Sequence, residues 1–258
     1  MSGAWLRAAA LALALLLAGW VPGEAARRVV SLDLCTDQML VLLAPQEIAG
    51  LSPLARDPAF SAVARQAAHL PMVRPSAEAV LRLHPDLVLA EPYAASLAVA
   101  ALRTLGLHVL TLPDPQTFAA IRAETARLAH VLGVETRAAA VIAAMDATLA
   151  GLPRAAGRRA IVLEPHGFAA GPHSLAGAVL RAAGYRNAAR GGWLGLERLL
   201  AHPPDLLVLP EAPGTPSLAT DLLENPALDT IPRRTVPAAW LICGSPFAAL
   251  AAARIAAR

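Results

Sequence analysis

Short apolar runs alternate with amphipathic stretches along residues 26–115. The runs have the length of strands and are apolar enough to be buried on both faces of a parallel sheet. Pro85 ends one of the helical stretches, and Gly106 closes the next. The pattern predicts strands at 28–32, 48–51, 86–90 and 109–112, and helices at 39–43, 76–83 and 97–105. Such alternation predicts a parallel α/β lobe.

A longer helical pattern occupies residues 117–152. Apolar residues recur at helical spacing from Ile121 to Leu149, and Gly133 is the one candidate break. A single helix of this length, rising about 1.5 Å per residue, would extend across a whole lobe. We therefore expect it to be a spine between two lobes.

The alternation of strands and helices resumes after residue 152. Strands are predicted at 160–163, 206–209 and 239–242, and helices at 174–183, 194–201 and 245–258. The expected parts are a leader at 1–25, an N-terminal α/β lobe at 26–115, the linking spine helix at 116–152 and a C-terminal α/β lobe at 153–258. The predicted fold class is α/β, with two Rossmann-like lobes that have mainly parallel sheets and are joined by one long spine helix.

Residues 1–25 have the pattern of a secretory signal. Arg7 precedes an apolar run of 14 residues, and Gly23-Glu24-Ala25 provides a small-residue cleavage site. The run is shorter than the roughly 20 residues that a membrane-spanning helix needs. The first cysteine, Cys35, lies too far on for a lipoprotein anchor. We expect a periplasmic protein that is soluble after cleavage of the signal peptide.

The composition excludes several classes of protein. Hydrophobic residues make up 56% of the 258 residues and charged residues 16%, which is too apolar for a disordered chain or a coiled coil. All 22 cationic residues are arginines, and with 19 acidic residues they give a net charge of +3. They form no concentrated basic run, so we expect no nucleic-acid partner.

One unit of sequence occurs in both halves. After Glu78, a proline follows at the seventh position and an aspartate at the eighth, and a short apolar strand comes next. The same spacing follows Glu197, which indicates two lobes of one plan. Proline and aspartate are explained by the end of a helix and a turn. Each glutamate lies in the first turn of its helix, where an acid can also simply complement the helix dipole by about 0.3 to 1 kcal/mol.

The paired units, the linking helix, the opening Arg-Val-Val-Ser-Leu strand and the export signal together resemble one family. It is the class III periplasmic substrate-binding proteins of ATP-driven (ABC) importers, which are receptors for cobalamin, haem and iron-siderophore complexes. The resemblance extends from Arg27 to Arg258. It implies a ligand cleft between the lobes, no enzymatic activity and no cofactor besides a cobalt- or iron-containing chelate as ligand. It also implies a monomer whose Glu78 and Glu197 dock onto the permease dimer in the inner membrane.

Residues that follow strands are the candidates for contact with the ligand, because ligands bind beyond the carboxyl ends of parallel strands. Flat aromatic rings suit a bulky chelate, and guanidinium groups suit its carboxylates or phosphates. Ordinary core packing is the alternative for the aromatic residues, and a solvated loop charge is the alternative for the arginines. The candidates are Cys35, Thr36, Arg56, Arg74, Tyr93, Phe168, Trp193 and Trp240.

Cys35 and Cys243 are the two cysteines of the chain, and each follows a predicted strand. In an oxidising compartment they could form a disulfide. That bond would close a loop of 208 residues and stabilise the fold by up to about 5 kcal/mol in the chain-entropy model. Free thiols and a thiolate site for a soft metal or haem are the alternatives.

The sequence also allows two other functions. His166 and His173 lie in one loop region, so a receptor that binds zinc or manganese directly is possible, although His84 and His202 are explained as helix ends. A cysteine-dependent enzyme would use Cys35 as nucleophile and His166 as base, but the sequence contains no supporting catalytic motif.

Overall fold

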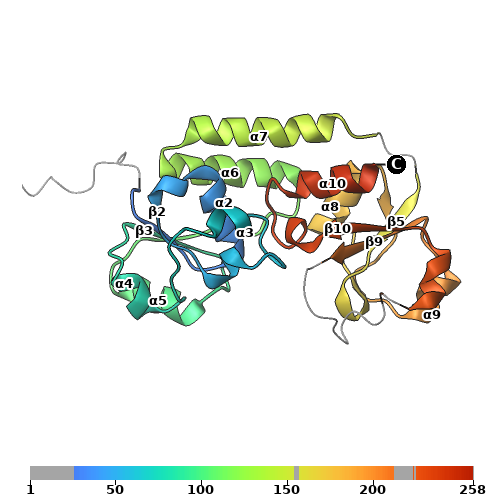
Figure 1. The fold of residues 1–258 in the computed structure, drawn as a ribbon, viewed down its shortest axis with the longest axis horizontal. Coiled ribbons are helices and arrows are strands. Elements are labelled where there is room, and N and C mark those ends of the chain that lie inside the picture. Colours follow the sequence, from blue (N-terminus) through green and yellow to red (C-terminus); the bar gives the residue numbers. More distant parts are fainter. Residues whose placement is uncertain (1–25, 154–156, 212–222, 224, 258) are drawn as a thin grey trace, which may run out of the picture.

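The first lobe is built on a four-stranded parallel sheet with the strand order β2-β1-β3-β4 (Figure 1). The computed structural model describes residues 26–153, 157–211, 223 and 225–257, so the predicted signal at 1–25 lies outside the described residues. In chain order the lobe contains β1 (Val29–Ser31), α2 (Leu34–Leu43), β2 (Ile48–Gly50), α3 (Ala64–Ala67), α4 (Ala77–Leu81), β3 (Leu87–Ala90), α5 (Ser96–Thr104) and β4 (Val109–Thr111). The predicted α/β alternation is confirmed.

The second lobe repeats this plan. Its parallel sheet has the order β10-β9-β5-β7, so the first, second, third and fourth main strands take the same places as in the first lobe. A separate antiparallel pair, β6 with β8, has no counterpart in the prediction. In chain order the lobe contains β5 (Arg159–Val162), β6 (Phe168–Ala169), α8 (Leu175–Ala182), β7 (Arg186–Asn187), β8 (Gly192–Trp193), α9 (Leu196–Ala201), β9 (Leu206–Glu211), β10 (Arg233–Pro237) and α10 (Ala248–Ala256).

The aspartate of the repeated unit accepts backbone hydrogen bonds in both lobes. The carboxylate of Asp86 accepts hydrogen bonds from the backbone N–H groups of Arg27 at 3.0 Å and Arg28 at 3.1 Å, just before β1. The carboxylate of Asp205 accepts one from the N–H group of Arg159 at 2.6 Å, at the start of β5. Each aspartate therefore satisfies backbone donors where the neighbouring strand begins. This explains its fixed place in the repeat better than a turn does.

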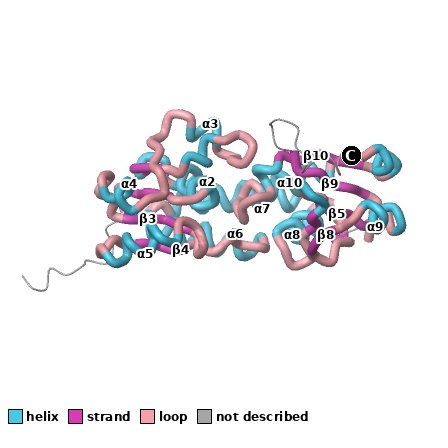
Figure 2. The backbone as a smooth tube through the Cα atoms, turned by 90° about the horizontal axis from the view of Figure 1, so that it is seen from below, coloured by secondary structure: helices cyan, strands magenta, loops and turns pink. Residues whose placement is uncertain are grey.

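The predicted single spine helix over 116–152 is wrong, because two antiparallel helices occupy this stretch (Figures 1 and 2). They are α6 (Phe118–Leu132) and α7 (Glu135–Ala150). Gly133 ends α6 with φ of 67°, a left-handed conformation that glycine adopts without steric cost. The N–H groups of Gly133 and Val134 then bond to carbonyl groups of the last turn of α6. The lobes are thus linked by a helical hairpin.

Two further predictions for individual elements are wrong. Asp33, and not a residue of 35–37, caps the first helix, and its carboxylate accepts the N–H group of Thr36 at 3.0 Å. The last strand is β10, and residues 239 and 240 of the strand predicted at 239–242 belong to a 3-10 helix, Ala238–Trp240. β10 is an edge strand in which only Val236 is buried, so its sequence lacks the apolar run of the other strands.

Both faces of each main sheet are buried. Successive residues of a strand point to opposite faces, so each sheet contributes to two apolar clusters. In the first lobe, one face packs on α2 and the helical hairpin and the other on α4 and α5; in the second, one face packs on α8 and α10 and the other on α9. Within the described ranges, no helix is both long enough and apolar enough to cross a membrane.

A disulfide and several hydrogen bonds join the second lobe to the first lobe and to the segment before α6, among them one from Gln38 Nε2 to Cys243 Sγ at 3.5 Å. Cys35 at the start of α2 forms a disulfide with Cys243, across a Cα–Cα distance of 5.3 Å. The N–H group of Gly244 donates to the Asp114 carboxylate at 2.6 Å. The N–H group of Leu175, at the start of α8, donates to the side-chain oxygen of Gln116 at 2.9 Å. We call the disulfide and the bond between Gly244 and Asp114 the interlobe joint.

Substitution of Gly244 tests the packing of this joint. A Cβ atom at Gly244 would overlap the carbonyl oxygen of Pro115 and lie 2.8 Å from Asp114 Oδ1. We expect Gly244→Ala to lower the free energy of unfolding by about 1 to 3 kcal/mol, measured by urea denaturation. A Cβ atom at Gly151 would have no neighbour closer than 3.7 Å, so Gly151→Ala is the control and should not destabilise. Equal stability of both variants would contradict the packing described here.

Candidate functional site

The site begins where β1 and β3 end. Asp33 follows β1, and its carboxylate joins two elements: one oxygen accepts the N–H group of Thr36 in α2, and the other accepts the N–H group of Glu91 after β3 at 2.7 Å. The hydroxyl groups of Ser31 and Thr36 lie 2.7 Å apart beside it. Asp33 therefore fixes the carboxyl ends of the two central strands against the start of α2.

Asp37 holds the next loop in the same way. It is fully buried, and its carboxylate accepts the N–H group of Ser52 at 3.0 Å and the hydroxyl group of Ser52 at 2.5 Å. Burial raises its pKa to about 7, and it outweighs the hydrogen bonds from serine, which favour the charged form. Asp37 thus ties α2 to the loop that follows β2.

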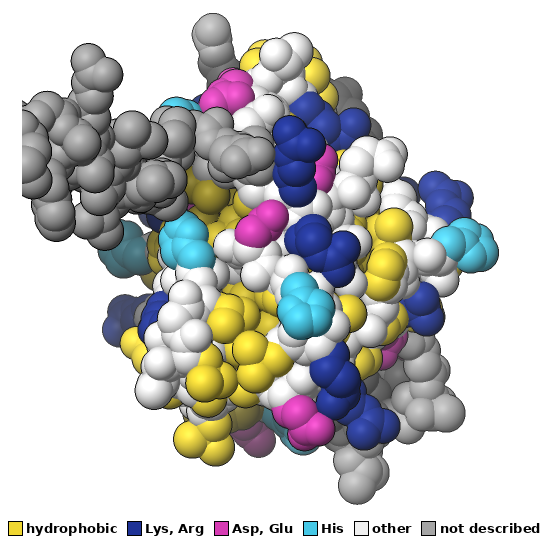
Figure 3. Space-filling view, turned by 90° about the vertical axis from the view of Figure 1, so that its left-hand side faces the viewer, with side chains coloured by type: hydrophobic (Ala, Val, Ile, Leu, Met, Phe, Trp, Pro, Cys, Tyr) yellow, Lys and Arg dark blue, Asp and Glu magenta, His cyan; other side chains and the backbone are white. Residues whose placement is uncertain are grey.

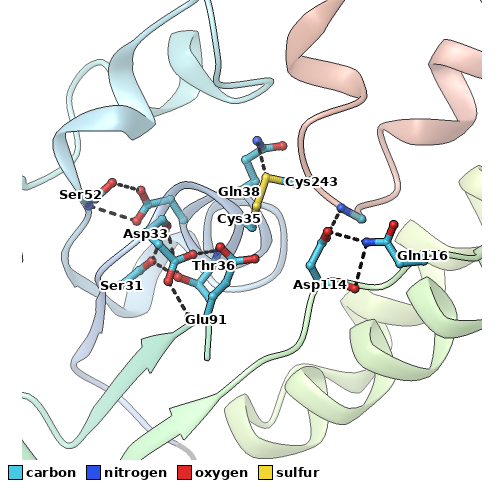
Figure 4. The surroundings of a disulfide bond; sticks show 12 residues. Ser31, Asp33, Cys35, Thr36, Gln38, Ser52, Glu91, Asp114, Gln116 and Cys243 are labelled. Carbon is cyan, nitrogen blue, oxygen red and sulfur yellow. Dashed lines mark hydrogen bonds between the residues drawn. A yellow bond between two sulfur atoms is a disulfide. The ribbon is translucent and has the colours of Figure 1, made fainter. Parts of the chain in front are cut away.

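The interlobe joint lies beside these strand ends. Figure 4 shows the disulfide with Asp33 and Glu91 on one side of it and Asp114 on the other. The disulfide prediction for Cys35 and Cys243 is confirmed, and the structure contains no free cysteine. The free-thiol and thiolate-site alternatives are therefore wrong for this structure. The cysteine-enzyme alternative fails with them, since the sulfur of a disulfide is not a thiolate nucleophile.

Acidic residues follow main strands in both lobes: Asp33, Glu91 and Asp114 lie in this region, and Glu164 follows β5 in the second lobe. Burial is the main cause that raises the pKa of Asp33, of Glu164 and of Glu91, which reaches about 7. The negative charges of Asp33 and Asp114 raise the pKa of Glu91 further. None of these acids is among the predicted site residues, although each lies one or two residues after a predicted strand. Asp33, Glu91 and Asp114 are close enough to interact electrostatically, so this part of the molecule is acidic.

A small pocket lies between the lobes next to the disulfide. Glu91 and Asp114 line it together with Cys35, Thr36 and Gly244, and apolar residues of α6 close it. Oxygen atoms of the two acids lie within 4.8 Å of each other and of Cys35 Sγ, the one potential metal-ligand group among the described residues. The disulfide removes the sulfur as a thiolate ligand. His166 and His173, which suggested direct metal binding, are not members of this group.

Five of the eight predicted ligand-binding residues fall into three groups. Cys35 and Thr36 are at the small pocket, where Thr36 is buried and hydrogen-bonded. Tyr93, just beyond β3, is 95% exposed, and Leu97 nearby is 88% exposed. Trp193 is 73% exposed and makes an edge-to-face contact with Phe168, with ring centroids 5.6 Å apart. These two rings lie in β6 and β8 of the second lobe, and Trp193 lines a second, larger pocket there.

Trp240 and the two arginines have other surroundings. Trp240 packs against the core of the second lobe, on the side of α8 and α10. The guanidinium group of Arg56 donates to the carbonyl groups of Ala67 and Leu70, which supports the loop around α3. Arg74 is exposed at the surface of the first lobe. The structure brings neither arginine into the small pocket.

Glu78 and Glu197 are exposed residues in the first turns of α4 and α9. The two short helices lie on the outer faces of the two sheets, on the side away from α7 (Figure 1). Glu78 forms a 3.0 Å ion pair with Arg82, and both side chains are largely exposed. Elsewhere on the outer end of the first lobe, basic, acidic, histidine and apolar side chains are interspersed (Figure 3).

The buried carboxyl of Asp37 predicts a dependence of stability on pH. Its pKa is raised from 3.8 to about 7 by folding, so the folded state binds the proton more tightly. Stability should therefore fall as the pH rises from about 4 to about 7. Asp37→Asn can keep both contacts with Ser52 without a charge, so we expect the variant to be more stable than the parent at pH 8, by roughly 1 to 3 kcal/mol.

Urea denaturation at pH 5.5 and pH 8 measures this difference. Glu78→Gln is the control, because that carboxylate is 86% exposed and should leave the difference between the two pH values unchanged. If Asp37→Asn retains the full pH dependence of the parent, Asp37 does not titrate in this range.

Comparisons with known proteins agree with this architecture. A crystal structure of a periplasmic haem-binding protein from Pseudomonas aeruginosa has a TM-score of 0.69 and 22% identity, covering 90% of this chain and 91% of its own. One from Vibrio cholerae has a TM-score of 0.71 and 18% identity, covering 88% and 96%. An ABC-type Fe³⁺-hydroxamate transport system structure from Saccharomonospora viridis has a TM-score of 0.67 and 22% identity, covering 90% and 92%.

Of the two sequence comparisons, one finds a match. A search of curated proteins gives no match. The sequence profile described as "Periplasmic binding protein" matches residues 29–232, which is most of the chain and includes strands of both lobes. This protein therefore belongs to the periplasmic binding protein family.

Proposed function

We propose that this protein is a periplasmic receptor of an ABC importer. It captures a metal chelate between its lobes and delivers it to the membrane permease, and it makes or breaks no covalent bond. The family membership supports the class of function. One observation supports the position of the ligand: the carboxyl ends of β1, β3 and β4 lie beside the interlobe joint, and ligands of parallel α/β sheets bind beyond such ends.

Tyr93 and Leu97 favour a ligand of large apolar surface. They lie close together in sequence beyond β3, and they are almost completely exposed. Two large side chains left in water contribute little to folding, whereas a flat chelate ring could cover both. We infer that they contact the chelate from the side of the first lobe.

The acidic strand ends favour particular chelates. Cobalamin, haem and ferric siderophores are the candidates, and the named structural relatives include haem-binding proteins and an Fe³⁺-hydroxamate transport system. Carboxylates of a ligand would be repelled by Asp114 and by the charged form of Glu91, while amide donors would be attracted. We therefore propose that the chelate presents neutral donors to this region, as cobalamin can, and that a haem would have to direct its propionates toward water.

A panel of chelates tests this function. Native mass spectrometry and absorption spectra of the mature protein would be recorded with cobalamin, haemin, a ferric hydroxamate, zinc and manganese. We expect one chelate to bind with one molecule per chain. Tyr93→Ala should weaken its binding by about tenfold, because a contact aromatic is lost. Leu250→Ala, at an exposed position of α10, should leave binding unchanged.

Two outcomes of these measurements would contradict the proposed chelate site. Retention of zinc or manganese with no chelate bound would favour the direct-ion receptor. Chelate binding that is insensitive to Tyr93→Ala would place the ligand elsewhere on the molecule.

The docking role of Glu78 and Glu197 gives a separate prediction. Both are exposed and lie on outer-face helices of the two lobes, so they can meet a two-fold partner without touching the interlobe region. We expect Glu78→Ala with Glu197→Ala to abolish import while the chelate affinity stays within about twofold of the parent. Glu135→Ala removes a first-turn glutamate of α7, on the other side of the molecule, and should import normally. Loss of chelate binding in the double variant would contradict the docking role.

A further inference from the structure

The larger pocket lies entirely within the second lobe. It has a volume of about 380 Å³, inside the range of about 300 to 1,000 Å³ that is typical of small-molecule sites. It lies between α9, β8 and the start of β5, and no residue of the first lobe or of the hairpin lines it. α9 forms the outer end of this lobe (Figures 1 and 2), so the pocket is separate from the interlobe joint.

The lining of this pocket combines cations with an apolar floor. Arg159, Arg190, Arg198 and His202 line it, and none of its lining residues is acidic. The floor includes buried side chains such as that of Leu199. A pocket with three guanidinium groups and no carboxylate has a positive potential, which is the opposite of the acidic region between the lobes.

Of the three arginines, Arg159 is held by a hydrogen bond to the backbone, and Arg190 and Arg198 can bind a ligand. The Arg159 guanidinium donates to the carbonyl group of Pro203 at 2.6 Å, which holds it at the pocket. Arg190 and Arg198 are exposed, and neither forms an ion pair with a described residue. Their fork-shaped donors are suited to a carboxylate or a phosphate group.

The internal repeat shows where the two lobes differ. Five residues before the repeat glutamate, the first lobe has Val73, which is buried and lies against Gly50. The second lobe has Gly192 at this place, with φ of 107°, and a Cβ atom added there would have no neighbour within 4 Å. At this distance from the repeat glutamate, the first lobe therefore has a packed side chain, and the second lobe has open space beside a glycine.

Trp193 adds a flat apolar wall to this space. It is the residue next to Gly192, and its edge-to-face contact with Phe168 limits the orientations of the ring. An aromatic or other flat ligand could pack on its exposed face.

We propose that this pocket is a second binding site, which takes a small organic anion with a flat apolar body, such as an aryl phosphate or aryl carboxylate. The anionic group binds Arg190 and Arg198, and the apolar body packs between Trp193 and the floor. This site is independent of the chelate between the lobes.

Calorimetric titration with three small probes tests the proposal. Phenyl phosphate carries both features of the ligand, inorganic phosphate only the charge, and phenol only the ring. We expect phenyl phosphate to bind once per chain, to quench the fluorescence of Trp193, and to bind at least about tenfold more tightly than either other probe. Its affinity should fall as salt is added.

Variants separate this pocket from the rest of the surface. Arg190→Gln with Arg198→Gln should weaken phenyl phosphate binding by about tenfold or more. Arg254→Gln, at an exposed arginine of α10, and Tyr93→Ala, in the first lobe, should leave it unchanged. Equal melting temperatures would establish that the arginine variant is folded.

Three results would overturn the proposal. They are no saturable heat with phenyl phosphate, equal affinity in the parent and in the Arg190 and Arg198 double variant, and loss of binding in Tyr93→Ala. The last result would assign the anion to the interlobe region instead.

Discussion

The arrangement of the two lobes depends on the interlobe joint. The disulfide between Cys35 and Cys243 connects the first turn of α2 to the loop before α10, 208 residues later. The bond from Gly244 to the Asp114 carboxylate places the same loop against the segment that leads into α6. The helical hairpin holds the lobes along one side, and this joint holds them at the strand ends. We therefore expect small changes of lobe geometry on ligand binding.

The joint has an electrostatic consequence for the residues around it. Asp33, Asp37 and Glu91 are largely shielded from water, and this burial favours their protonated forms. Backbone N–H groups and serine donors stabilise the charged form of Asp33 and Asp37, whereas Glu91 also meets the repulsion of two nearby carboxylates. The same residues fix the ends of the strands and set the potential that a ligand meets. The second lobe has the opposite potential beside α9, so its pocket suits ligands of opposite charge.

The sequence predicts what local pattern controls. Apolar strands and the repeated unit gave the two parallel lobes, since a strand buried on both faces has a continuous apolar sequence. The sequence does not predict β10, because this edge strand buries only Val236 and lacks an apolar run. It predicts one helix in place of the hairpin, because a glycine such as Gly133 can end a helix or lie within one. The sequence leaves open whether Cys35 and Cys243 pair, because a disulfide requires a short distance between their α-carbons and the sequence does not give that distance. The acids at the joint and the pocket beside α9 arise from tertiary packing, so spacing alone did not reveal them.

X-ray scattering of the oxidised protein and of the variant with Cys35→Ser and Cys243→Ser tests most directly whether the joint fixes the lobes. The oxidised protein should match the single arrangement of lobes in Figure 1, and the variant should show a broader distribution of interatomic distances and a larger radius of gyration. Identical scattering from the two proteins, with both fully folded, would contradict this account, because the hairpin alone would then determine how the lobes are placed.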